Sequence, residues 1–137
     1  MPAVLEESAA PKIGKGRVNT RARARIGVVV PASNTNLESD MILLRPHNVS
    51  LHFARVGGYD LDATPDSEQI RQFALASLDE TIACLSAAQP DVILYGCTSA
   101  TLAHGPEFDA RFAGSIQQRA GMPAVTAAGA LVEALHH

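Results

Sequence analysis

Hydrophobic residues occur along the chain in short runs, separated by longer segments with helical spacing. The first run, residues 26–30, is mostly β-branched and uncharged, which is typical of a strand buried on both faces of a sheet. Similar runs follow at residues 49–56, 91–95 and 124–125. Apolar and polar positions alternate in the run 49–56, so we expect this strand to lie at an edge of the sheet.

The segments between these runs predict four helices, at about residues 36–44, 65–88, 106–120 and 126–135. Thr35 and Glu38 have the spacing of a capping box at the start of the first helix. Apolar positions of the second segment recur at helical spacing as far as residue 88, before a proline, and therefore predict one continuous helix.

Strands and helices alternate along the chain, which predicts a parallel four-stranded sheet with helices on both faces. We expect a three-layer, doubly wound α/β domain with the flavodoxin-like strand order 2-1-3-4. In such sheets, ligands bind beyond the carboxyl ends of the strands, where the strand order reverses. The crevice is therefore expected between the first and third strands, with the loop 31–35 beside the turn 96–99.

Charge divides the chain into two parts. Residues 1–25 contain six basic and two acidic residues, whereas residues 26–137 contain five basic and twelve acidic ones. We interpret residues 1–24, which have no apolar periodicity, as a disordered basic extension, and residues 25–137 as the α/β domain. The acidic domain argues against nucleic-acid binding.

Other features of the sequence indicate where the protein resides. It has no apolar run of about 18 residues and no secretory signal at its start, so we expect no membrane segment and a cytoplasmic location. In a reducing compartment the two cysteines are expected to be free thiols.

Cys97 is the strongest candidate for chemistry. It follows a predicted buried strand, and a helical turn starting at Thr98 would place free N–H groups near the sulfur, which favours the thiolate. A thiolate at a strand end can act as a base or a nucleophile. Buried, unreactive cysteines are also common, and both alternatives stay open. Cys84, between Ile82 and Leu85 on the second predicted helix, is expected to be a core or boundary residue.

Polar residues occupy both loops of the expected crevice, with Ser33, Asn34 and Thr35 in one, and Thr98 and Ser99 in the other. Hydroxyl, amide and backbone N–H groups of this kind bind carboxylates, but helix capping uses the same residue types. Two such turns beside a thiol favour a binding site for a small carboxylate.

Other kinds of site find less support. The histidines and cysteines do not have the spacing of metal ligands, so no metal site is predicted. The loop after the first strand lacks the glycines of a phosphate loop, which makes a nucleotide-binding domain the least favoured class. His104 is either a proton donor or a surface histidine.

Three segments together carry a resemblance to a known family. Residues 30–38, VPASNTNLE, are similar to a P-S-S-N-T-x-x-E loop; residues 95–99, YGCTS, resemble a loop that bears an active-site cysteine; and residues 125–132 resemble the strand and helix that precede a second domain. These are features of the aspartate/glutamate racemase superfamily, and the chain most resembles the maleate cis-trans isomerases. The resemblance covers about residues 25–135.

The resemblance implies an enzyme without a cofactor, whose site lies between two similar α/β domains. Cys97 would be the nucleophile that adds to the double bond of maleate, after which rotation and elimination give fumarate. Asn34 would bind one carboxylate of the substrate, and the other positions that contact substrate or the developing enediolate would be Ser33, Thr35, Thr98 and Ser99.

Alternatives remain within the same resemblance. A racemase would use a pair of cysteines to move the Cα proton of an amino acid. An arylmalonate-type decarboxylase would use a Thr-Ser pair like Thr98-Ser99, but that branch usually has glycine where Cys97 stands. Family chains normally continue into a second domain, whereas this one ends at His137. It is therefore expected to be either half of such a site, completed in a homodimer, or a truncated, non-catalytic carboxylate-binding domain.

Overall fold

The computed structural model describes residues 23–57 and 66–137. Its strands are β1 (Ala24–Pro31), β2 (Val49–Val56), β3 (Val92–Tyr95) and β4 (Ala124–Thr126). Its helices are α1 (Leu37–Leu44), α2 (Ser67–Leu75), α3 (Leu78–Ala87), α4 (Thr98–Leu102), α5 (Pro106–Ala120) and α6 (Ala127–Leu135). Residues 1–22 of the predicted extension lie outside the described residues.

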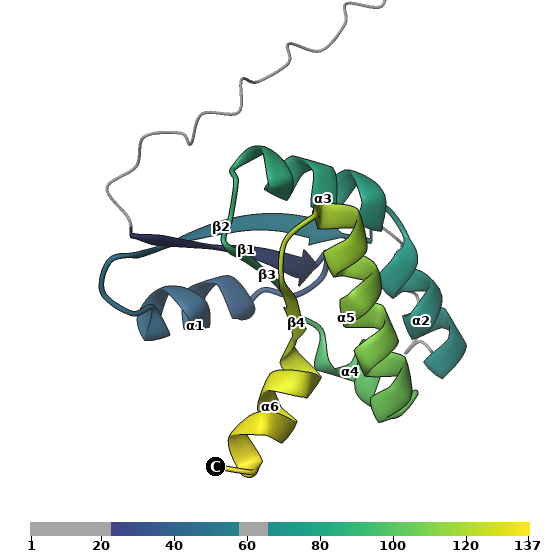
Figure 1. Ribbon diagram of the computed structural model, residues 1–137. Coiled ribbons are helices and arrows are strands. Elements are labelled where there is room, and N and C mark those ends of the chain that lie inside the picture. Colours follow the sequence, from purple (N-terminus) through teal and green to yellow (C-terminus); the bar gives the residue numbers. More distant parts are fainter. Residues whose placement is uncertain (1–22, 58–65) are drawn as a thin grey trace, which may run out of the picture.

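The strands form one parallel sheet with the order β2-β1-β3-β4, which confirms the predicted fold class (Figure 1). Helices α3 and α5 lie on one face of the sheet, and α1 lies on the other (Figure 1). Right-handed crossovers explain this arrangement, since the chain moves one way from β1 to β2 and the opposite way from β2 through β3 to β4. The strand at 49–56 is an edge strand, as its alternating pattern predicts.

The face covered by α3 and α5 contains the main hydrophobic core. Tyr95 of β3 packs edge-on against Phe112 of α5, with ring centroids 4.7 Å apart. The core is completed by the buried apolar residues Val29, Val56, Leu78, Ile82, Leu85, Ile93, Ala100 and Ile116.

Helix α1, on the opposite face, is much less buried. None of its residues is buried, and Ile42, Leu43 and Leu44 are 58%, 82% and 80% exposed. Beneath it, Val28 and Val30 of β1 are fully buried. The sheet is therefore covered by a thick apolar layer on one side and a thin one on the other.

The segment 65–88, predicted as one helix, forms two. The prediction is wrong at Ser77, which has a left-handed φ of +59° and separates α2 from α3. Thr81 stabilises the break, because its buried hydroxyl shares its one hydrogen between the carbonyls of Ser77 (2.8 Å) and of Arg55 in β2 (2.9 Å). The apolar residues keep their helical spacing on both sides of Ser77, so the sequence pattern does not reveal the break. The break depends instead on the contact with β2.

Candidate active site

The loops after β1 and β3 meet at the carboxyl edge of the sheet. Val29 and Tyr95 are paired in the parallel register, and the amide of Gly96 donates to the carbonyl of Val29 at 2.9 Å. A hollow of about 410 Å³ lies between the two loops, as the strand order predicts. Its described lining residues are Pro31, Asn34, Asn36, Leu37, Asp40, Gly96, Cys97, Thr98, Ser99 and Ala127.

Cys97 is partly exposed and lies at the N-cap position of α4, directly after the turn glycine. Its sulfur is 3.6 Å from the hydroxyl oxygen of Ser99, within hydrogen-bond range for sulfur. The core or boundary position expected for Cys84 is wrong, because this residue is exposed on α3. Its neighbours Ile82 and Leu85 face the core, and Cys84 lies between them on the solvent side of the helix.

Asn34 holds the loop after β1 through its own side chain. Its Oδ1 accepts hydrogen bonds from the main-chain amides of Asn36 (2.9 Å) and Leu37 (2.8 Å). The predicted capping box of Thr35 and Glu38 is therefore not formed, and Asn34 takes the capping role. Because Oδ1 accepts these two bonds, the Nδ2 amide group is the end available to donate to a ligand.

The remaining predicted binding residues divide into two groups. Thr98 and Ser99 line the hollow next to Cys97, Thr98 partly buried and Ser99 exposed. Ser33 and Thr35 are exposed in the loop after β1, and neither is among the residues that line the hollow. His104 lies beyond α4, where its Nε2 is 3.1 Å from the carbonyl of Ser67.

The two loops contact each other through Gly96. A side chain at this position would clash with Leu37 at the start of α1 and would lie 3.0 Å from the carbonyl oxygen of Val29. Glycine therefore allows Leu37 to approach the cysteine turn closely. The close contact explains why Leu37, which the sequence did not single out, lines the hollow.

Asp40 is the one charged side chain among the described residues that line the hollow. No arginine or lysine is among them, so an anionic ligand would be held by neutral donors such as Asn34, the hydroxyls and the main-chain amides. Asp40 lies four residues after Asn36 and therefore on the same helical face, a spacing from which its position could have been predicted.

Arg55 was also missed by the sequence analysis. Its Nη1 donates to the carbonyls of Pro31 (3.2 Å), Ala32 (3.0 Å) and Asn34 (2.8 Å), and its Nη2 forms an ion pair with Glu38 at 2.9 Å. A basic residue near the carboxyl end of an edge strand is a weak signal for such a role, and only the strand pairing brings it to this loop.

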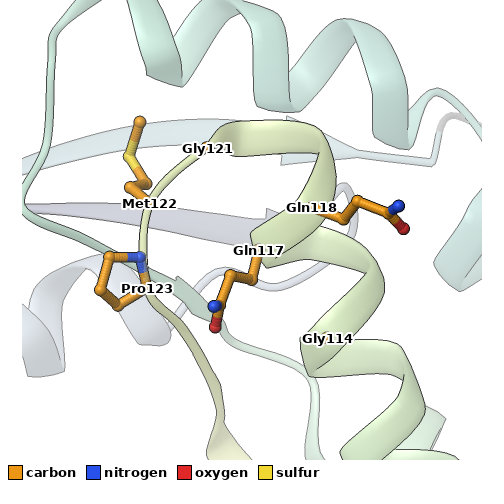
Figure 2. Close-up of a pocket in the computed structure, with 6 residues that line it drawn as sticks. All are labelled: Gly114, Gln117, Gln118, Gly121, Met122 and Pro123. Carbon is orange, nitrogen blue, oxygen red and sulfur yellow. The ribbon is translucent and has the colours of Figure 1, made fainter.

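A second hollow of about 510 Å³ lies at the C-terminal end of α5, bordered by Gly114, Gln117, Gln118, Gly121, Met122 and Pro123 (Figure 2). It lies before β4, at the amino ends of the strands, whereas Cys97 lies at their carboxyl ends. Its lining has neither an ionisable nor a nucleophilic side chain, so the smaller hollow beside Cys97 is the better candidate for chemistry.

Within residues 23–57 and 66–137, no group of three or more His, Cys, Asp or Glu side chains has the arrangement needed to hold a metal ion. The helices of this described part are too short or too polar to cross a membrane.

Comparisons with known proteins agree with the fold. A maleate isomerase of Pseudomonas putida is 33% identical over an alignment that covers 82% of this chain and 48% of that protein. A maleate cis-trans isomerase of Nocardia farcinica, solved as a mutant with a covalently bound succinylcysteine intermediate, is 30% identical with a TM-score of 0.69 over 82% of this chain and 48% of that one. No protein-family model matches the chain.

An arylmalonate decarboxylase, 21% identical over 82% of this chain and 46% of its own, has the same fold with a TM-score of 0.65. The chain is thus an α/β protein with the fold shared by maleate isomerases and arylmalonate decarboxylases. It is a homologue of maleate isomerase and spans about half the length of the relatives it matches.

Proposed function

We propose that this chain supplies the cysteine side of a cis-trans isomerase site for a small unsaturated dicarboxylate such as maleate. The observation that carries the proposal is that Cys97 and Asn34 line one hollow at the carboxyl ends of β3 and β1. Covalent addition to an unsaturated carboxylate needs a nucleophile and donors for the carboxylate oxygens, and these side chains supply both. The succinylcysteine in the Nocardia farcinica isomerase supports the proposal, because addition of a cysteine thiol to a butenedioate gives this adduct.

In the proposed reaction, the Cys97 thiolate attacks one alkene carbon. A carbon–sulfur bond forms, and the π electrons move into the neighbouring carboxylate to give an enediolate. The former double bond is now single and rotates. The electrons then return, the carbon–sulfur bond breaks, and fumarate leaves with the thiolate restored. The cycle consumes no proton, electron or cofactor.

The other site residues have binding roles in this proposal. Nδ2 of Asn34 donates to one carboxylate, since Oδ1 already accepts two main-chain hydrogen bonds. The hydroxyls and amides of Thr98 and Ser99 donate to the carboxylate that becomes the enediolate. Ser33 and Thr35 are proposed only as neighbours of Asn34.

The second candidate is a carboxylate-binding domain without turnover. It is favoured by the described lining of the hollow, because Asn34, the hydroxyls and the main-chain amides would bind a carboxylate whether or not the thiol reacts. A decarboxylase of the arylmalonate type is a third candidate, supported by the Thr98-Ser99 pair and opposed by the cysteine beside it.

The proposal also includes a second copy of the chain, packed on α6 beside the hollow. Leu131, Val132 and Leu135 of α6 are 50%, 47% and 78% exposed, and α6 begins at Ala127 in the wall of the hollow. We therefore include a homodimer in the proposal, to be tested by light scattering with and without maleate. A mechanism through a free thiol fits a reducing compartment such as the cytoplasm.

Proton NMR in D2O tests these functions together. The purified chain is incubated with maleate, aspartate, glutamate and an arylmalonate, beside Cys97→Ala. Fumarate formation that is lost in Cys97→Ala is the expected result. Cα deuteration would instead indicate a racemase, and loss of CO2 a decarboxylase. Binding of maleate with no product would favour the carboxylate-binding domain.

Alkylation provides an independent test, with Cys84 as an internal control. Iodoacetate carries a carboxylate and iodoacetamide does not, so donors around Cys97 should raise the iodoacetate-to-iodoacetamide rate ratio there above the ratio at exposed Cys84. The ratio at Cys97 should fall in Asn34→Ala. Equal ratios at both cysteines would argue against a carboxylate site at Cys97.

A further inference from the structure

Arg55 holds the loop that carries Asn34, although it comes from a different strand. It is the second-last residue of β2, next to β1 in the sheet. Its Nη1 donates to the carbonyl oxygens of Pro31, Ala32 and Asn34, at 3.2, 3.0 and 2.8 Å. One guanidinium nitrogen thus contacts three main-chain carbonyls of a four-residue segment.

Further contacts fix the arginine itself. Its Nη2 is 2.9 Å from a carboxylate oxygen of Glu38 in the first turn of α1. Its main-chain carbonyl accepts a hydrogen bond from the buried hydroxyl of Thr81 at 2.9 Å, and its backbone is paired with Val30 in the sheet. Arg55 therefore connects the well-packed sheet to the exposed loop and to the start of α1.

These contacts determine how Asn34 is presented to the hollow. The Asn34 carbonyl is bonded to Arg55, and its Oδ1 is bonded to the amides of Asn36 and Leu37. With both oxygens engaged, Nδ2 is the polar group of this side chain left to meet a ligand. Lysine could not replace the arginine, because a single ammonium cannot reach the loop carbonyls and Glu38 together, as the two Nη atoms of the planar fork do.

We propose that Arg55 is a positioning residue for carboxylate recognition, acting through the main chain of residues 31–34. It acts at a distance from the ligand: it is not among the residues that line the hollow, and both its Nη atoms are engaged by loop carbonyls and Glu38. The functional part of this inference rests on the proposed carboxylate site, whereas the structural part concerns the loop alone.

The structural part is tested by amide hydrogen exchange on the full chain. Arg55→Lys should speed exchange at Asn34, Asn36 and Leu37 by about tenfold, because their hydrogen bonds depend on the loop conformation. Exchange in the core of β1 should be unchanged. Arg119→Lys is the matched control, since Arg119 also pairs with an acid, Asp79, and its side chain is 42% exposed, as is that of Arg55.

The functional part is tested by the kinetics of maleate isomerisation. Arg55→Lys should raise KM about tenfold with little change in kcat, because a displaced Asn34 weakens binding of substrate and transition state alike. A loss of folded protein would lower apparent kcat at constant KM instead. The KM of the double variant with Asn34→Ala should be no higher than that of Asn34→Ala alone, since both changes remove the same interaction between Asn34 and the substrate.

Each outcome bears on one part of the inference. If Arg55→Lys and Arg119→Lys exchange alike at Asn34, the positioning role is overturned whatever the activity. If the unmodified chain neither binds nor converts maleate, the proposed function fails, and exchange alone decides the role of Arg55. Faster exchange with unaltered KM in an active protein would restrict Arg55 to loop stability and overturn its part in recognition.

Discussion

The two loops that form the hollow are held in different ways. The turn after β3 is fixed by the main chain, since the amide of Gly96 donates to the carbonyl of Val29 in β1. Ala100 and Thr101 of the following helix, α4, are buried. The loop after β1 also has main-chain hydrogen bonds, from Ala32 to Val56 and from Asn34 to Pro31, but it is held in addition by the side chains of Asn34 and Arg55. The proposed nucleophile thus lies on the turn held by main-chain contacts, and the residue proposed to bind a carboxylate lies on the loop that also depends on side-chain hydrogen bonds.

The largest expected effect separates chemistry from binding. Cys97→Ser should lower kcat for maleate isomerisation by roughly 10³-fold or more, since a neutral hydroxyl is a far weaker nucleophile than a thiolate. Asn34→Ala should instead raise KM by about 10- to 100-fold through loss of a hydrogen bond to a charged group. Steady-state kinetics of both variants checks this assignment of chemistry to Cys97 and of binding to Asn34. The assignment is wrong if Asn34→Ala lowers kcat as much as Cys97→Ser.

The contact between the loops is tested by Gly96→Ala. The added methyl group must displace Leu37 and lies against the Val29 carbonyl, so the variant should lose about 1–3 kcal/mol of unfolding free energy. Leu37 would also shift in the wall of the hollow and weaken maleate binding. Urea unfolding and a maleate titration measure the two effects.

Gly114→Ala is the matched control, because nothing lies within 4 Å of a Cβ at this helical position. That change should stabilise the chain by about 0.5–1 kcal/mol, the usual gain from alanine over glycine inside a helix. Equal stabilities of the two variants would mean that Gly96 can take a side chain and that the loops are not closely packed.

A smaller effect is expected from the charge on the loop side of the hollow. Asp40 lines it and repels an anionic ligand, so Asp40→Asn should strengthen maleate binding by about two- to fivefold at low salt. The gain should shrink as ionic strength rises. A Kd that does not change between the two proteins would place the bound carboxylates away from Asp40.

The difference between the loops also explains what could be predicted from sequence. The run 26–30, the alternation of strands and helices and the position of Cys97 follow from local patterns, and the strand order and the meeting of the two loops follow from these by general rules of parallel sheets. The break between α2 and α3 at Ser77 and the role of Arg55 do not follow, because both depend on contacts between residues 17 to 26 positions apart in sequence.

The prediction of a capping box at the start of α1 was wrong for a related reason. Thr35 and Glu38 have suitable spacing, but Glu38 is engaged by Arg55 of β2, and Asn34 caps the amides instead. A local motif was outweighed by a contact that only the folded sheet creates. Likewise, the helical period around Ile82 correctly indicates a buried face but does not place Cys84, which lies just beside it.

The smallest effect concerns an arginine–glutamate pair outside both loops, which gives a baseline for the Arg55–Glu38 contact. Arg71 and Glu68 are three residues apart on α2, and the hydrogen bond from Arg71 lowers the pKa of Glu68 from 4.5 to about 2. The folded pKa is depressed, so the pair stabilises the fold above the unfolded pKa, and this contribution disappears as pH falls towards about 2. Because Glu68 is exposed, the change in stability should be small.

Carbon NMR of the Glu68 carboxyl group checks this between pH 3 and 6. The unmodified chain should keep Glu68 ionised throughout, whereas in Arg71→Met the carboxyl should titrate near its ordinary pKa of 4.5. Exchange at Asn34 and the KM for maleate should be the same in both proteins, because the hydrogen bonds that join this pair lie within α2. A change in either would mean that removing any surface arginine disturbs the loop, and the special position of Arg55 at the end of β2 would then lose its support.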